Sequence, residues 1–72
     1  MSSNIRYIRE AKDISRVELS KLSGVSEPML KILESDKFDI LNSKLDTLVK
    51  IARSLRVKVI DLLPIEKRTW IK

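Results

Sequence analysis

Apolar residues recur every three or four positions along most of the chain, which is the spacing of one face of an α-helix. This spacing predicts five short helices, over about residues 4–12, 15–23, 26–35, 44–55 and 59–63. The clearest stripe lies in the fourth of these, at Leu45, Leu48, Ile51, Ala52 and Leu55. The pattern therefore predicts an all-α fold, built as a compact five-helix bundle.

The chain's only glycine, Gly24, separates the second predicted helix from the third. Leu19 and Leu22 precede it, and Leu30 and Leu33 follow it, all at positions that we expect to face the core. Two short helices joined by a tight turn that contains glycine form a helix-turn-helix unit. We expect Gly24 to end the second helix in the left-handed conformation, which glycine adopts easily because it has no Cβ.

Serine residues mark the starts of three predicted helices. Ser15 and Glu18 have the S-x-x-E spacing of a capping box. Ser26 is placed to cap the third helix, and Pro28 falls in the first turn, where its missing N–H has no helical partner to lose. Ser43 precedes the fourth helix and is expected to cap it in the same way.

Length and composition limit the classes of function. The 72 residues suffice for one domain, which we place at residues 1–64, followed by a tail at 65–72. There is no cysteine and no histidine, which excludes disulfides, thiolate or imidazole metal ligands, and nucleophiles or bases of those types. We therefore expect no enzyme activity, no cofactor and no bound metal. No segment resembles a membrane span or a signal peptide, so we expect a soluble, cytoplasmic protein without membrane contact.

Charge is distributed unevenly along the chain. The net charge is +5, which favours a polyanionic partner such as nucleic acid. Residues 44–58 carry five positive charges and one negative, whereas residues 17–43 carry three positive and five negative. The helix-turn-helix unit therefore lies in the least basic part of the sequence.

Several stretches resemble the phage repressor and Cro-like helix-turn-helix family, also called the xenobiotic-response-element family. They are IREAKDISRVELSKLSGVS, the pair Leu33-Glu34, LDTLVKIARSLRV and VIDLL, in this order within about residues 5–63. The resemblance implies a lambda-repressor-like fold and a sequence-specific DNA-binding transcriptional regulator. It also implies that the third helix, about Ser26–Ser35, enters the major groove of double-stranded DNA.

The resemblance assigns roles to individual residues. It implies a structural ion pair between Arg9 and Glu34, with Gly24 in the turn. The residues expected at DNA phosphates are Arg16, Ser26, Lys37 and Lys44. The residues expected at base edges are Glu27, Pro28, Met29, Lys31 and Ile32. Family members usually carry glycine at three further positions, which here are Asp13, Asp36 and Arg56.

The expected base-contacting residues depart from the usual amides, serines and arginines. Glu27 is suited either to accept a hydrogen bond from a cytosine amino group or simply to favour the helix dipole. Pro28, Met29 and Ile32 are spaced as one outward apolar patch, suited to thymine methyl groups or to another protein. Alternatively, the segment 36–42 covers this patch. The alternative function is a protein-interaction module, for example antitoxin-like, on the same fold.

Apolar residues near the end of the chain suggest assembly. Related repressors bind DNA as symmetric dimers with one recognition helix for each half-site. Val59, Leu62 and Leu63 are suited either to complete the core or to pair with a second copy. We expect a homodimer through the fifth helix and the tail, at Val59, Leu62, Leu63, Trp70 and Ile71.

Overall fold

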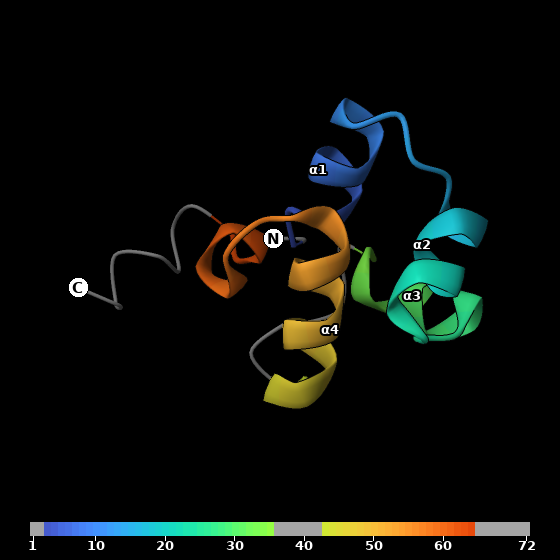
Figure 1. Ribbon diagram of the computed structural model, residues 1–72. Helices are drawn as coiled ribbons and strands as arrows, with labels where there is room; N and C mark the ends of the chain where they lie inside the picture. The colour runs from blue at the N-terminus through green and yellow to red at the C-terminus, as the bar shows by residue number, and fades with distance from the viewer. Residues whose placement is uncertain (1–2, 36–42, 65–72) are drawn as a thin grey trace.

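The computed structural model describes residues 3–35 and 43–64. Its α-helices are α1 (Ile5–Ala11), α2 (Arg16–Ser23), α3 (Glu27–Leu33) and α4 (Leu45–Leu55), and one 3-10 turn, η2 (Val59–Leu62), follows them (Figure 1). No strand occurs in these residues, so the prediction of an all-α fold is confirmed for the described part. Lys37, Trp70, Ile71 and the whole tail lie outside the described residues.

The fifth predicted α-helix is a single 3-10 turn, so the expectation of five α-helices is not met. Arg56 ends α4 in the left-handed conformation, and Pro64 stops any further helix. The few residues between them form one tight turn, in which the Lys58 amide donates to the Asp61 carboxylate at 3.0 Å. The segment is too short for consecutive α-helical hydrogen bonds.

Local sequence signals fix the turn between α2 and α3. The Glu18 amide donates to Ser15 Oγ at 3.1 Å, and the Glu18 carboxylate accepts from the Ser15 amide, which completes the predicted capping box. Gly24 has φ +76°, and its amide donates to the Ser20 carbonyl. Ser26 Oγ accepts from the Met29 amide at 3.3 Å, so Ser26 caps α3 as predicted.

Two non-glycine residues adopt positive φ angles where the family usually carries glycine. Asp13 and Arg56 each have φ 58°. The left-handed conformation brings Cβ close to the following carbonyl oxygen, at a cost of roughly 1–2 kcal/mol for an ordinary residue. Arg56 lacks the short polar side chain that eases this conformation in Asp13, so it is the more strained of the two.

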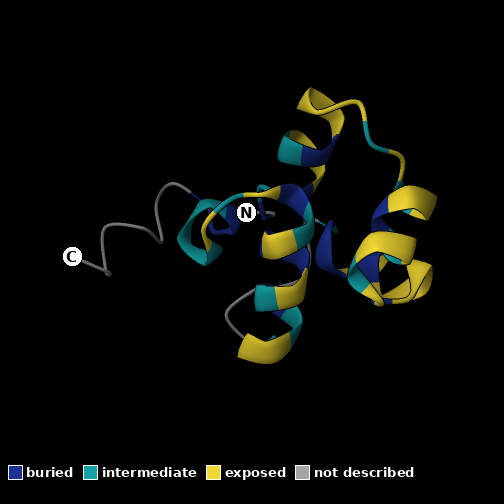
Figure 2. Ribbon diagram, in the orientation of Figure 1, coloured by how far each residue is buried: buried dark blue, intermediate teal, exposed yellow. Residues whose placement is uncertain are grey.

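The core gathers residues from every described element (Figure 2). α2 packs against α3 and α4, and α4 also packs against η2. Leu62 and Leu63 are buried in this core. This confirms the expectation that they complete the core and contradicts the alternative role in a dimer interface, because side chains that complete the core of one chain are not available to a second copy. Val59 is only partly buried. The buried apolar residues are Ile5, Leu19, Val25, Leu30, Leu33, Leu48, Ile51, Ala52, Leu55, Leu62 and Leu63.

Two leucines expected in the core are exposed instead. Leu22 is 62% exposed. The inward face of α2 runs through Arg16, Leu19 and Ser23, and Leu22 lies about 100° around the helix from the middle of that face. Leu45 is 67% exposed, because it begins α4 at the end that points away from η2 in Figure 1. The remaining four residues of the α4 stripe are buried.

Ser43 does not cap α4. The N-cap residue is Lys44, and no side chain caps this helix. The prediction was wrong because α4 begins at Leu45, one residue later than expected, and a cap must directly precede the first helical residue.

The described helices are short. The longest, α4, has 11 residues. Within residues 3–35 and 43–64, no helix combines the length and the hydropathy needed to cross a bilayer.

Candidate nucleic-acid interface

Helix α3 presents one face to the core and the other to solvent. Leu30 and Leu33 are buried, whereas Met29 is 43% and Ile32 48% exposed. All five residues expected at base edges are exposed, and we call them together the α3 outer face: Glu27, Pro28, Met29, Lys31 and Ile32. The arrangement follows from helical periodicity, because Leu30 and Leu33 anchor one side of the helix and the five other residues lie around the remaining sides.

An open hollow of about 510 Å³ lies beside the α3 outer face. It is lined by Arg16 from the first turn of α2 and by Glu27, Pro28 and Lys31 from α3. The structure thus brings a residue expected at DNA phosphates next to residues expected at base edges. Two cations and one carboxylate line the hollow, so its local charge favours an anion.

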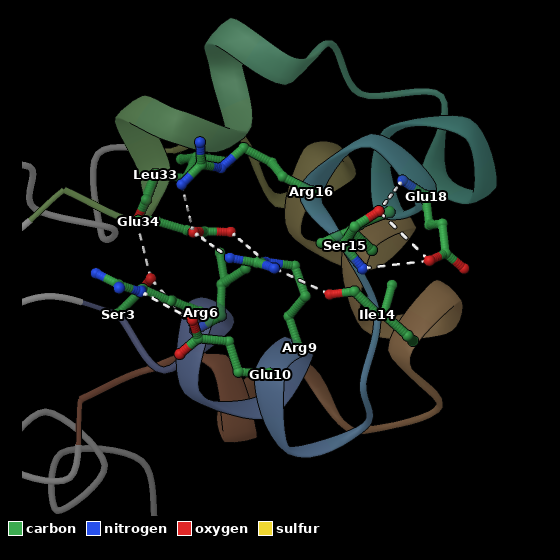
Figure 3. Close-up of polar contacts among 12 residues, drawn as sticks. Ser3, Arg6, Arg9, Glu10, Ile14, Ser15, Arg16, Glu18, Leu33 and Glu34 are labelled. Atoms are coloured by element: carbon green, nitrogen blue, oxygen red, sulfur yellow. Dashed lines mark hydrogen bonds and ion pairs between the residues drawn. The ribbon is translucent and has the colours of Figure 1, made fainter.

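Three charged residues meet at the end of α3, and we call them the Glu34 junction (Figure 3). Arg9 Nε donates to Glu34 Oε2 at 2.9 Å, and a second nitrogen of the same guanidinium donates to Oε1 at 3.1 Å. Arg16 also donates to Oε1, at 3.3 Å. Arg9 and Glu34 are both buried. The ion pair between them is present, as expected.

The Arg9 guanidinium is well satisfied. Its third nitrogen donates to the Ile14 carbonyl at 2.9 Å, which joins α1 to the start of α2. The hydrogen bond to Glu34 raises the pKa of Arg9, and this outweighs the lowering caused by burial. Because the raised pKa lies above that of an unfolded arginine, the stabilisation is complete at lower pH and is lost only as the pH rises through the folded value. Arg9 therefore stays charged throughout the neutral range.

Arg16 is bound less completely than Arg9. Its side chain is about one-third exposed, and it makes a single hydrogen bond to Glu34 among the described residues. Its Nε is buried without a hydrogen-bond partner there. Two guanidinium groups share one carboxylate, so the three residues of the Glu34 junction together carry a net charge of +1. That charge adjoins the hollow through Arg16.

The other residues expected at DNA phosphates differ from Arg16 in where they lie. Ser26 is exposed, with its hydroxyl oxygen already accepting from the Met29 amide. Lys44 is exposed at the N-cap of α4 and does not line the hollow. Lys37 lies outside the described residues.

Two polar contacts had no clear signal in the sequence. Ser3 Oγ donates to the Leu33 carbonyl at 2.8 Å and accepts from the Ile5 amide at 3.4 Å, which ties the start of α1 to the end of α3. The bond between Arg16 and Glu34 is the other. A serine before a helix indicates a cap. Local spacing does not show that Ser3 also contacts Leu33, 30 residues away, or that Arg16 contacts Glu34, 18 residues away.

The most basic segment of the chain forms a separate surface. Asp46, Lys50 and Arg53 are exposed on the side of α4 opposite Leu48 and Ile51, and we call this side the α4 outer face. Lys50 lies 3.6 Å from Asp46 in a solvent-exposed ion pair. Much of the charge of residues 44–58 therefore lies away from the core, on residues that do not line the hollow.

The described residues contain no cluster of acidic side chains that could bind a metal ion. Within residues 3–35 and 43–64, no group of three or more acidic side chains is arranged to hold a metal ion.

Together, the capped α2, the left-handed Gly24 and the solvent-facing α3 define a helix-turn-helix domain. Residues 4–68 match the family model described as the Cro/C1-type HTH DNA-binding domain, and the chain belongs to this family. Comparison with curated proteins gives no significant match, and neither does comparison with solved structures. The resemblance to the repressor and Cro-like family is thereby confirmed.

Proposed function

We propose that this protein is a sequence-specific transcriptional regulator of the repressor type that inserts α3 into the major groove of double-stranded DNA. The observation that carries the proposal is the convergence of Arg16 and Lys31 on the hollow beside the exposed face of α3, in a chain of a DNA-binding family. Phosphate contacts orient a protein on DNA, while residues at the groove distinguish sequences. The proposal places the protein in the cytoplasm and gives it no catalytic role.

In this mechanism Arg16 holds a phosphate at the hollow, assisted by Ser26 at the start of α3. Lys44, and Lys37 outside the described residues, hold further phosphates. The Glu34 junction keeps α1, α2 and α3 in fixed relation, so that the phosphate contacts and the α3 outer face meet DNA together.

The test is the salt dependence of binding to a random duplex, measured by fluorescence anisotropy. Each phosphate contact adds about 0.9 to the slope of log affinity against log salt. Arg16→Gln is expected to lower the slope by about 1, whereas Arg53→Gln, the same charge change on the α4 outer face, leaves it nearly unchanged. Thermal unfolding of both variants verifies that they are folded. Absence of binding at low salt would contradict the proposal.

We further propose that the protein acts as a homodimer with one α3 for each half-site, about one DNA turn apart. A helix of seven residues is only about 10 Å long, so one copy contacts few base pairs. Because Leu62 and Leu63 are buried, the interface uses Val59 and the tail with Trp70 and Ile71. Sedimentation of the full chain tests this, and a monomer mass independent of concentration to high micromolar would overturn it.

A protein-interaction module is the second candidate function. It is favoured by one observation, the exposure of Met29 and Ile32 where amides and arginines are usual. In this alternative the Pro28, Met29 and Ile32 side chains bind a protein such as a toxin or another regulator. Stable binding of a partner protein together with no affinity for DNA at low salt would favour it.

A further inference from the structure

The α3 outer face divides into two strips. Glu27 and Lys31 are one helical turn apart and line the hollow next to Arg16. Met29 and Ile32 lie on the other side of the outward arc and do not line the hollow. Pro28 also lines the hollow, and it lies at the edge of the second strip, next to Ile32. We call Pro28, Met29 and Ile32 the apolar strip.

The chemistry of the two strips differs. Lys31 shares the hollow with Arg16, where the local charge favours a phosphate. The side chains of the apolar strip have no N–H or O–H group, so they cannot form the paired hydrogen bonds by which guanine or adenine is recognised. In the major groove, the feature recognised by apolar contact is the 5-methyl group of thymine.

We propose that the apolar strip recognises thymine methyl groups, so that this protein selects sites with thymine opposite Met29 and Ile32. The proposal rests on the proposed function, because it names the DNA feature that the same α3 outer face distinguishes. Phosphate contacts at Arg16 and Lys31 hold the helix in the groove, and methyl contacts supply the sequence preference.

The dimensions of the apolar strip favour DNA over a protein partner. A stable protein interface buries about 800 Å² on each side, contributed by 20–30 residues. The apolar strip has three side chains, two of which are about half exposed, and the cations of the hollow border it. A surface of that size, next to positive charge, suits a few methyl groups on a polyanion.

Selection from random duplexes with the full chain supplies the preferred site. Each selected thymine is then replaced by deoxyuridine, which removes only the 5-methyl group and leaves base pairing intact. Affinity is expected to fall about fourfold for each contacted methyl, the effect of exposing one buried carbon. Replacing unselected thymines in the same duplex is expected to have no effect.

Variants connect the effect to the apolar strip. Ile32→Ala is expected to reduce the ratio of thymine to uracil affinity at one position to about 1. Leu22→Ala, which truncates an exposed leucine on α2, is the matched control and keeps the ratio at about fourfold.

The outcomes separate this inference from the function on which it rests. Equal affinity for thymine and uracil duplexes, with steep salt dependence retained, overturns methyl recognition and leaves DNA binding intact. An Ile32→Ala variant that weakens both duplexes equally, or leaves both unchanged while losing a protein partner, also overturns it. Loss of all DNA binding at low salt contradicts both.

Discussion

The Glu34 junction and the α3 outer face both involve α3, yet they are built from opposite kinds of contact. The junction is buried and charged, and its carboxylate accepts from two guanidinium groups. The outer face is exposed and largely apolar. A buried ionic group tolerates little change, because removing one partner leaves the other uncompensated. An exposed side chain can change with small effect on stability, which lets binding specificity vary on a constant fold.

The largest expected effect is on the junction itself. Glu34→Gln removes the carboxylate to which both guanidinium groups are hydrogen-bonded, and we expect it to lower the free energy of unfolding by about 3–5 kcal/mol. Glu10→Gln removes an exposed ion pair with Arg6 and a weaker attraction to Arg9, and we expect it to change the free energy of unfolding by about 0.5 kcal/mol. Urea denaturation measures both. Equal, small losses would show that the junction does not hold the helices together.

Two leucines allow the same comparison of a buried with an exposed position, without a change in charge. Leu30→Ala opens a cavity in the core and is expected to cost about 2–5 kcal/mol. Leu22→Ala removes the same atoms from an exposed position and costs about 0.5 kcal/mol or less. A large loss for Leu22→Ala in chemical denaturation would mean that Leu22 is buried in solution.

Glycine substitutions at two arginines, Arg56 and Arg53, are expected to change stability in opposite directions. Arg56→Gly relieves a residue at φ 58° and is expected to raise stability by up to about 1 kcal/mol. Arg53→Gly places glycine inside α4 and is expected to lower stability by about 1 kcal/mol. Melting temperatures of the two variants should therefore move in opposite directions, and destabilisation by both would argue against the left-handed conformation at Arg56.

The smallest expected effect on stability is on the α3 outer face. Ile32→Ala truncates a side chain that is about half exposed, and we expect the free energy of unfolding to change by about 0.5 kcal/mol or less. Calorimetric unfolding checks this. A loss of 2 kcal/mol or more would show that Ile32 belongs to the core and not to a binding surface.

The sequence contained enough information for the local features of this unit. The Ser15 capping box, the Gly24 turn and the Ser26 cap depend on residues only two to four positions apart, and all three are present. The Arg9–Glu34 pair spans 25 residues, and it was expected only because of the family resemblance. Caps and turns are predictable because their hydrogen bonds close within one turn of the chain.

The errors about which side chains are buried share one cause, which is the placement of helices against each other. Periodicity identified Leu22 and Leu45 as apolar helix residues, but it did not show where neighbouring helices end, and both are exposed. The spacing of Leu62 and Leu63 fits either the core or a dimer interface, and only the packing of the chain shows that they complete the core. The bond from Arg16 to Glu34 was missed for the same reason, because it depends on how α2 and α3 cross.

In the proposed mechanism, DNA contacts the weakly charged α3 outer face and not the more basic α4 outer face. The most direct measurement is an NMR titration of the 15N-labelled full chain with a duplex at low salt. We predict that the largest amide shift changes occur at Arg16 and residues 26–32, with Lys50 and Arg53 nearly unchanged. Changes confined to Lys50, Arg53 and their neighbours on α4, with α3 unaffected, would contradict the account.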